Sequence, residues 1–429
     1  MPGQAVVIGG GAIGVCSAYF LSLAGWDVTL VDRGEIGHGC SYGNACLIVP
    51  SHSHPLPGPG VVGRALRWMV RRDSPFYIRP RLDRDLLRWA WQFRRYCTPE
   101  ASHRGFDALL ALSRASLALY EDLARTPDLE FFFRRAGLLH VYVTDEGTAG
   151  ARGEREALEA AGFRTTLFDA REVREFQPVL GDGVRGGLFI AGEAHTESLG
   201  FVRAMAAACR RRGARLLEHA TVRRIRVGRR RVEAVDVESR SGREAIAADV
   251  VVIAAGSWTP AIAAPLGVQI PLQPAKGYSC TIDAFEEMPT VPILIQERRV
   301  IITPLDGRVR FGGTLELAGF DPTIDSVRYQ AVVRAAREVL RQPPPMQHEE
   351  PWCGFRPVAP DGLPIIDRVG ADGLIVATGH AMLGITQAPI TGKLVADLAE
   401  GRTPSVPLAP WRLDRFPQRL EARGLRRSH

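Results

Sequence analysis

The hydrophobic positions at the start of the chain change period twice. A short apolar run at residues 5–8 enters a glycine turn, and an apolar stretch with helical spacing follows as far as Gly25. A second apolar run, at residues 28–31, stops at Asp32. Short β-branched runs on either side of a helical stretch predict a strand–helix–strand unit, which is the building block of a parallel sheet.

The rest of the chain shows both periods. Helical spacing predicts helices over residues 61–70, 83–96, 102–123, 153–161, 198–212, 324–340 and about 383–400. Short apolar runs predict strands at 137–143, 164–168, 215–218, 248–256 and 374–377, a hairpin at 221–227 and 231–238, and a strand-rich region at 268–314 that includes 270–272. The predicted fold class is α/β: a doubly wound, Rossmann-like domain plus a second domain built on an antiparallel sheet with helices.

The turn after the first strand carries a glycine motif. Gly9, Gly11 and Gly14 form the pattern G-x-G-x-x-G. The first glycine permits the tight bend, the second lets a pyrophosphate approach the backbone, and the third lets the helix pack on the strand. Asp32 follows 18 residues after Gly14, where a carboxylate binds a ribose hydroxyl. The unit predicts a dinucleotide site for FAD or NAD rather than for NADP.

Composition narrows the class of protein. The 429 residues suggest two domains, and the net charge of +7 is carried almost entirely by arginine, because the only lysines are Lys276 and Lys393. This charge permits attraction to carboxylates or anionic lipid, and we expect no nucleic-acid partner. The 7 cysteines form no C-x-x-C pair, and no signal peptide is recognised. We therefore expect free thiols, no metal site and a cytoplasmic protein, with peripheral attachment to the inner face of the membrane left open.

Two loops follow the first unit. The small-residue loop at 34–46, with Ser41 and Asn44, either lies against a flat ring or is an ordinary surface loop. Residues 50–60 carry His52 and His54 without a nearby third ligand, so we expect a loop bordering the entrance of a site rather than a metal centre.

The segment 61–95 combines arginine with tryptophan at helical spacing, for example Arg67 with Trp68 and Arg88 with Trp89. Such a pattern is typical of a membrane-interface helix, and it also fits a helix packed on the protein with its arginines in water. Both interpretations stay open at this point.

Two later stretches raise a family resemblance. Residues 352–366 read WCGFRPVAPDGLPII, and residues 377–392 begin ATGHAMLGIT. Together with the glycine motif they resemble the D-amino-acid oxidase-like flavoenzymes, and most closely the bacterial D-amino-acid dehydrogenases. The resemblance implies non-covalent FAD, an FAD-binding domain of residues 1–50, 145–262 and 346–429, and a substrate domain of residues 51–144 and 263–345.

The resemblance also implies a reaction. A D-amino acid loses a hydride from Cα to flavin N5, the imine hydrolyses to a 2-oxo acid and ammonia, and the electrons pass to a quinone or another non-oxygen acceptor. No side-chain base is strictly required. The alternatives are a D-proline or D-hydroxyproline dehydrogenase, a glycine- or sarcosine-type oxidase, an NAD-dependent dehydrogenase, and a non-catalytic flavin-binding subunit of a membrane complex.

The resemblance assigns roles to particular side chains. Arg356 is expected to grip the substrate carboxylate with two hydrogen bonds, Tyr278 to assist it, and His380 to act as a base or to support the flavin. A structural ion pair for Arg356 and sheet packing for Tyr278 are the alternatives. His52 and His54 are expected at the substrate entrance.

The expected FAD-binding residues come from several separate stretches of the chain. They are Gly9, Gly11, Ala12, Ile13, Gly14, Asp32, Arg33, Ser41, Asn44, Ala45, Val222, Ala254, Ala255, Gly256, Trp258, Gly354, Gly379, His380, Leu383, Gly384, Ile385 and Thr386. Because some related enzymes attach flavin covalently to Cys or His, a covalent link near His38, Cys40 or Cys46 is left open.

Overall fold

A computed structural model of the chain describes residues 3–68, 74–346 and 348–417. One of its sheets has six strands in the order β10-β2-β1-β14-β21-β20, and all neighbours are parallel except β20 and β21. The strands are β1 (Gln4–Ile8), β2 (Asp27–Val31), β10 (Arg215–Leu217), β14 (Val250–Ile253), β20 (Ile365–Arg368) and β21 (Leu374–Thr378). The predicted doubly wound sheet is confirmed.

The central strand β1 is buried on both faces because it separates two hydrophobic cores. Ala5 and Val7 pack with α1 (Ala12–Leu23), α7 (Ser198–Arg211) and α10 (Ala388–Glu400). Val6 and Ile8 pack on the other side, beneath a three-stranded sheet of β11 (Thr221–Gly228), β12 (Arg231–Ser239) and β13 (Gly242–Ala247). This arrangement explains why the first apolar run is continuous rather than alternating.

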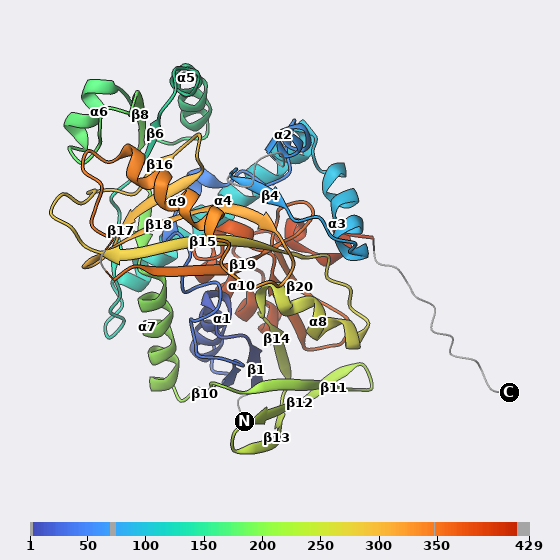
Figure 1. Cartoon of the computed structure of the whole chain (residues 1–429). Coiled ribbons are helices and arrows are strands. Elements are labelled where there is room, and N and C mark those ends of the chain that lie inside the picture. Colours follow the sequence, from blue (N-terminus) through green and yellow to red (C-terminus); the bar gives the residue numbers. More distant parts are fainter. Residues whose placement is uncertain (1–2, 69–73, 347, 418–429) are drawn as a thin grey trace.

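The second large sheet has nine strands. Its path is β19-β15-β18-β17-β16-β6-β8-β7, and β4 pairs with β18. The strands are β4 (Phe76–Ile78), β6 (Leu138–Tyr142), β7 (Thr165–Asp169), β8 (Gly186–Ile190), β15 (Gln273–Asp283), β16 (Ile293–Ile295), β17 (Val300–Pro304), β18 (Arg308–Leu317) and β19 (Glu350–Val358). Most pairs are antiparallel, as expected for the second domain, and α9 (Ser326–Val339) covers one face (Figure 1).

Three of these strands depart from the expected division of the chain. Strands β7, β8 and β19 belong to the large sheet, although the predicted boundaries assign their residues to the FAD-binding domain. The domain boundaries therefore stay a prediction. The positions of β7, β8 and β19 favour assigning these strands to the substrate domain instead.

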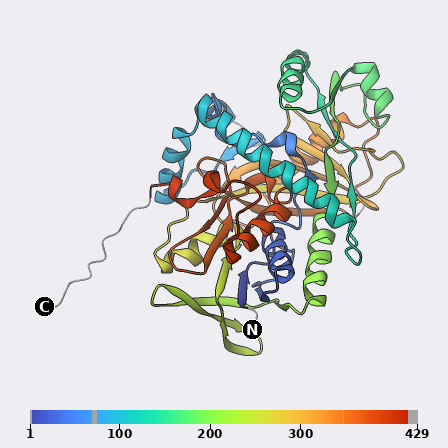
Figure 2. The ribbon, with the colours of Figure 1, turned by 180° about the vertical axis from the view of Figure 1, so that it is seen from behind.

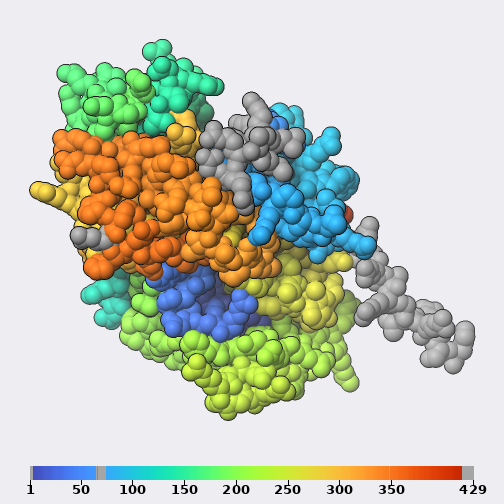
Figure 3. All heavy atoms as spheres, viewed as in Figure 1, coloured from blue at the N-terminus to red at the C-terminus, as the bar shows by residue number. Residues whose placement is uncertain are grey.

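The remaining elements surround the two sheets. They are α2 (Val61–Trp68), α3 (Arg84–Arg95), α4 (Pro99–Ala124), α5 (Asp145–Ala160), α6 (Ala170–Phe176), α8 (Thr259–Ala263), a small sheet of β3 (Leu47–Ile48), β9 (Ala194–Thr196) and β5 (Phe133–Arg134), and short 3₁₀ turns such as η1 (Pro50–His52), η2 (Gly256–Trp258) and η4 (Ala381–Leu383). The long helix α4 crosses the back of the molecule (Figure 2). In the space-filling view, N-terminal residues show between the orange α9 region and the green β11–β13 region (Figure 3).

Several predicted boundaries differ from the structure. The helix expected at 153–161 begins at Asp145, because the Thr144 hydroxyl caps it by accepting a hydrogen bond from Gly147 N. The helix expected from residue 383 is split, since η4 ends at Leu383 and α10 begins only at Ala388. The strand expected at 270–272 does not form. Residues 69–70, at the end of a further predicted helix, lie outside the described residues.

Candidate active site

One large cavity of about 1840 Å³ lies between the two sheets. Ligand pockets usually measure about 300–1,000 Å³, so this volume has room for a dinucleotide and a small substrate together. Most of the predicted site residues line it: Gly9, Gly11, Ala12, Ile13, Asp32, Arg33, Ser41, Asn44, Ala45, His52, His54, Val222, Ala254, Ala255, Gly256, Trp258, Gly354, Arg356, His380, Leu383, Gly384, Ile385 and Thr386. Gly14, Gly379 and Tyr278 are not among the lining residues.

The glycine turn forms one end of the cavity. Gly9 has φ +112°, a left-handed conformation that favours glycine. A Cβ on Gly14 would lie 1.8 Å from the Gly9 carbonyl oxygen, so Gly14 allows α1 to approach the turn and acts through packing. The N-cap residue of α1, Gly11, has no side chain to cap the helix, and the first turn has no acidic residue. The end of this helix therefore suits a pyrophosphate.

Asp32 stands at the end of β2 beside this turn. Its Oδ2 accepts a hydrogen bond from Gly10 N at 2.6 Å, and its Oδ1 accepts one from Gly34 N at 2.8 Å. Each carboxylate oxygen has a second lone pair, so Asp32 both fixes the turn and remains able to accept from a ribose hydroxyl. The next residue, Arg33, places its guanidinium 4.2 Å from the centre of the Trp258 ring, which forms a flat wall at this end.

The loop at 34–46 is held by its own polar side chains. The Ser41 hydroxyl accepts from Ala12 N at 2.9 Å, and Asn44 bonds to the backbone of Ser41 and of Cys46. Cys46 is fully buried with φ +61° and is not a lining residue, whereas Cys40 lines the cavity. Burial raises the pKa of the Cys40 thiol to about 11, and its sulfur bonds to the Phe355 backbone. His38 also lines the cavity, and non-covalent attachment of the flavin stays a prediction.

The turn after β21 closes another side of the cavity. Gly379 has φ +81° and makes the bend, so its contribution is the turn itself. His380 Nε2 pairs with the Thr391 hydroxyl at 2.9 Å, and burial lowers the pKa of His380 to about 3. Because the bond to Thr391 ties the ring nitrogen Nε2 to α10, the supporting role expected for His380 fits better than that of a base. The Thr386 hydroxyl donates to Leu47 O at 3.0 Å and joins this turn to β3.

Arg356 projects from β19 into the cavity. Its side chain crosses Gly277 on β15, where an added Cβ would lie 2.4 Å from Nη2, and its Nη1 donates to Thr314 O at 2.8 Å. No carboxylate pairs with Arg356 among the described residues, and burial lowers the pKa of its guanidinium. A buried positive charge without a negative partner is costly, so this arrangement favours an anionic ligand. Within the described part of the chain, Arg356 therefore forms no structural ion pair.

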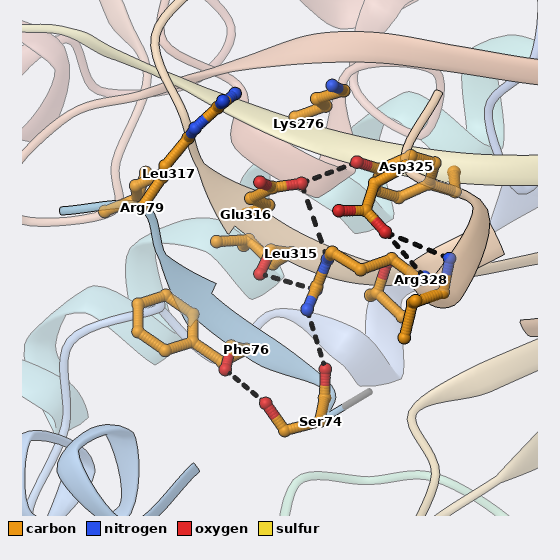
Figure 4. Close-up of polar contacts among 12 residues, drawn as sticks. Ser74, Phe76, Arg79, Lys276, Leu315, Glu316, Leu317, Asp325 and Arg328 are labelled. Carbon is orange, nitrogen blue, oxygen red and sulfur yellow. Dashed lines mark hydrogen bonds and ion pairs between the residues drawn. The ribbon is translucent and has the colours of Figure 1, made fainter. Parts of the chain in front are cut away.

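The substrate-binding role expected for Tyr278 is wrong. Its side chain lies on one face of β15, and the side chain of Arg356 crosses the other face. Its hydroxyl donates to Glu316 Oε2 at 2.5 Å, and its ring packs in the core beneath α9. Figure 4 shows Glu316 also facing Arg328, whose Nε lies 3.4 Å from Oε2. Burial and then the bond to Glu316 raise the pKa of Tyr278. The tyrosine thus belongs to a buried polar network and cannot reach a substrate held by Arg356.

His52 and His54 both line the cavity, close to α4 and β6. His54 stacks on Phe106, with ring centres 4.4 Å apart. His52 Nε2 lies 3.0 Å from Nε2 of His140, which sequence reasoning did not single out. His140 is an isolated histidine in an apolar run, so no local pattern marks it. Trp352 was also missed as a lining residue, although it stands in the quoted motif and lies over Gly43 and Gly354.

Comparisons with known proteins identify the family of the chain. A family model described as FAD dependent oxidoreductase matches residues 4–398. A D-amino acid dehydrogenase from Cereibacter sphaeroides is 34% identical over 418 residues, covering 96% of this chain and 95% of the relative. One from Vibrio vulnificus is 32% identical over 404 residues, covering 93% and 96%.

Solved structures show the same fold. A glycine oxidase from Geobacillus kaustophilus aligns with TM-score 0.76 and 23% identity, covering 97% of this chain and 100% of that one. An L-proline dehydrogenase from P. horikoshii aligns with TM-score 0.70 and 20% identity, covering 97% and 99%.

The chain belongs to the FAD dependent oxidoreductase family. It is an enzyme, and its cofactor is FAD. The N-terminus of α1 with glycine at its N-cap, the close packing at Gly14 and the carboxylate of Asp32 fit that cofactor's pyrophosphate and ribose.

Proposed function

We propose that the protein is a D-amino-acid dehydrogenase that oxidises its substrate to a 2-oxo acid and ammonia and passes the electrons to a quinone or another non-oxygen acceptor. The observation that carries the proposal is Arg356, a cation in the cavity wall without a carboxylate partner among the described residues. The names of the relatives support an amino acid of D configuration. FAD, when bound, supplies the acceptor for the hydride from the substrate Cα.

The residues of the chain bind and orient the substrate. Arg356 donates two parallel hydrogen bonds to the substrate carboxylate, and Thr314 O holds the guanidinium in place from behind. A two-point grip fixes the direction of the Cα–H bond, which is the geometric requirement for hydride transfer. The imine product then takes up water, and the C–N bond breaks to give the oxo acid and ammonia.

The wall of the cavity indicates how an apolar acceptor would arrive. Helix α3 lines the cavity with Trp89 and Phe93, and Trp89 is buried with its indole N–H donating to Val358 O. The outer side of the same region exposes Leu82, Leu87 and Trp91, at 104%, 64% and 60%.

Exposed arginines, Arg84, Arg88, Arg94 and Arg95, surround these apolar side chains. An apolar patch rimmed by cations suits the surface of an anionic membrane, where a quinone is dissolved. Among the described residues, no helix is long and apolar enough to cross a membrane. The side chains of Arg64, Arg67 and Trp68, and residues 69–73, lie outside the described part of the chain.

Steady-state turnover tests the substrate and the acceptor together. The purified holoenzyme is offered D-alanine, D-proline, D-hydroxyproline, glycine, sarcosine and the L-enantiomers, with either a dye or oxygen as acceptor, and oxo acid and ammonia are measured. We expect turnover of D-amino acids with the dye and little consumption of oxygen. Preference for D-proline or D-hydroxyproline changes the substrate class, and rapid oxygen use with glycine indicates an oxidase.

Vesicle binding tests the membrane surface separately. We expect the wild-type protein to sediment with anionic vesicles and a Leu87→Ser, Trp91→Ser variant to bind them less. Val327→Ser is the matched control, because Val327 is exposed at 46% on α9. Equal binding by all three proteins contradicts the proposed surface.

A further inference from the structure

A hydrogen-bonded chain of three side chains lies in the cavity wall. It begins at His52 on η1, continues through His140 on β6 and ends at Glu154 on α5. The Nε2 atoms of the two histidines are 3.0 Å apart, and His140 Nδ1 lies 2.8 Å from Glu154 Oε1. All three residues line the cavity that also holds Arg356.

The carboxylate of Glu154 assigns the tautomers of both rings. His140 Nδ1 lies 2.8 Å from Glu154 Oε1 and also 2.8 Å from the amide nitrogen Nε2 of Gln296. An ionised carboxylate only accepts hydrogen bonds and is the stronger partner, so we assign the ring proton of His140 to Nδ1, donating to Glu154. With its proton on Nδ1, His140 accepts at Nε2, and His52 donates from its own Nε2. His52 is thereby left with a lone pair on Nδ1, for which no protein partner is found among the described residues.

Other side chains keep Glu154 in position. Tyr142 donates to Oε2 at 2.9 Å, and Gln296 Nε2 donates to Oε1 at 2.7 Å. Arg299 orients the amide of Gln296, because Arg299 Nη1 donates to Gln296 Oε1 at 2.8 Å. The Glu154 side chain is 31% exposed, and that of His140 is 3% exposed. The Glu154 end of the hydrogen-bonded chain is therefore in reach of solvent.

The neighbouring charges are consistent with a neutral His52 beside an ionised Glu154. Burial lowers the pKa of His52, and His140, Arg299 and His54 lower it further. Burial raises the pKa of Glu154, but the bonds from His140 and Tyr142 and the charge of Arg299 lower it below its ordinary value overall. Glu297 also faces this group, since it acts on Tyr142.

The reaction of the proposed function leaves one proton to be removed. An amino acid binds mostly as an ammonium carboxylate, and its nitrogen needs a lone pair before Cα can release a hydride. Loss of the hydride and one ammonium proton gives the protonated imine, so that proton must have an acceptor.

We propose that His52 Nδ1 accepts the ammonium proton of the substrate, and that His140 and Glu154 relay the charge toward solvent. The N–H bond of the ammonium breaks as the Nδ1–H bond forms. His52 passes its Nε2 proton to His140, and His140 passes its Nδ1 proton to Glu154, which releases it to water. His52 is a catalytic residue in this scheme, and His140 and Glu154 are positioning residues. The inference rests on the proposed function.

The test is the pH profile of anaerobic flavin reduction by a D-amino acid that the wild-type holoenzyme oxidises. We expect His140→Phe and Glu154→Gln to slow reduction at pH 7 by about a hundredfold or less, within the range of proton-transfer effects. The loss should shrink toward pH 10, where most of the substrate amine is already neutral. Because the two residues act in one chain, the double variant should be little slower than His140→Phe alone.

Matched controls separate this inference from a general defect. Glu156→Gln changes an exposed carboxylate on the same helix and should keep the wild-type profile. The flavin spectrum and reduction by dithionite show whether each variant is folded and loaded. Variants with the wild-type profile, or with an equal loss at every pH, overturn the relay while leaving the proposed function intact. If no amino acid reduces the wild-type enzyme, the proposed function fails and the relay fails with it.

Discussion

At the scale of the single residue, the account depends on the charge of Arg356 and the space that Gly277 leaves for it. We expect Arg356→Met to raise the dissociation constant of the substrate by about a hundredfold or more, since two charge-assisted hydrogen bonds are each worth about 1.5–3 kcal/mol. Arg356→Lys keeps the charge but loses the planar grip, and it should recover only part of the affinity. Substrate titrations of the flavin spectrum measure both, and unchanged affinity in Arg356→Met contradicts the assignment.

Glu193 provides a pH dependence at the same scale. This residue is 1% exposed, Ser51 N donates to it at 3.1 Å, and burial raises the pKa of its carboxyl from 4.5 to about 8. The folded state holds the proton more tightly than the unfolded state. Its contribution to stability is therefore complete below about pH 4.5 and is lost as the pH rises to about 8.

Glu193→Gln removes that titration. We expect the unfolding free energy of Glu193→Gln to exceed that of wild type by a margin that grows from pH 5 to pH 8 and reaches about 2 kcal/mol or more. The Tm of the variant should exceed the wild-type Tm by a margin that grows in the same way. Glu130→Gln, at an exposed carboxylate, should show no such trend. A margin for Glu193→Gln that does not change with pH would contradict the raised pKa.

Residues also show where sequence reasoning ends. Arg356 and Tyr278 both come from strands of one sheet, and family resemblance suggested a site role for each. Strand β15 is buried on both faces, so its sequence has no alternation that tells which side chains face the cavity. The pairing of β15 with β18 and β19 decides which side chains face the cavity. That pairing joins strands far apart in the sequence, so the local pattern does not reveal it.

At the scale of the element, α9 is fastened to the large sheet by a buried ion pair. Arg328 on α9 lies with its Nε 3.4 Å from Glu316 on β18, and both side chains are at most 5% exposed. We expect Glu316→Ala to destabilise the protein by about 3–5 kcal/mol, because it leaves a buried positive charge without this partner. The double variant Glu316→Leu, Arg328→Met should recover much of the loss. Chemical denaturation measures both, and a single variant that is as stable as wild type contradicts the role of the pair.

Elements with strong local signals were predicted well, and those set by tertiary contacts were not. The βαβ unit and the hairpin of β11 and β12 follow from apolar runs, glycine turns and Asp32. The late start of α10 does not, because residues 384–387 are held by contacts such as the bond from Tyr120 to Ile385 O. The position of His140 beside His52 has the same origin, since 88 residues separate the two histidines.

At the scale of the whole molecule, two sheets of different topology enclose one cavity. The parallel sheet supplies the glycine turn and Asp32, and the large sheet supplies Arg356 and His140. In the proposed function, the cofactor at the parallel sheet and the substrate at the large sheet therefore share one cavity, which brings the substrate carbon close to the flavin.

The most direct test of the account is anaerobic bleaching of the flavin absorbance by single amino acids. The purified holoenzyme is mixed without oxygen with D- and L-enantiomers in turn, and the Arg356→Met variant is treated in the same way. We expect D-amino acids to bleach the wild-type flavin, their L-enantiomers to leave it unchanged, and the variant to require far more substrate. A wild-type flavin that no amino acid bleaches, although dithionite does, contradicts the central claim.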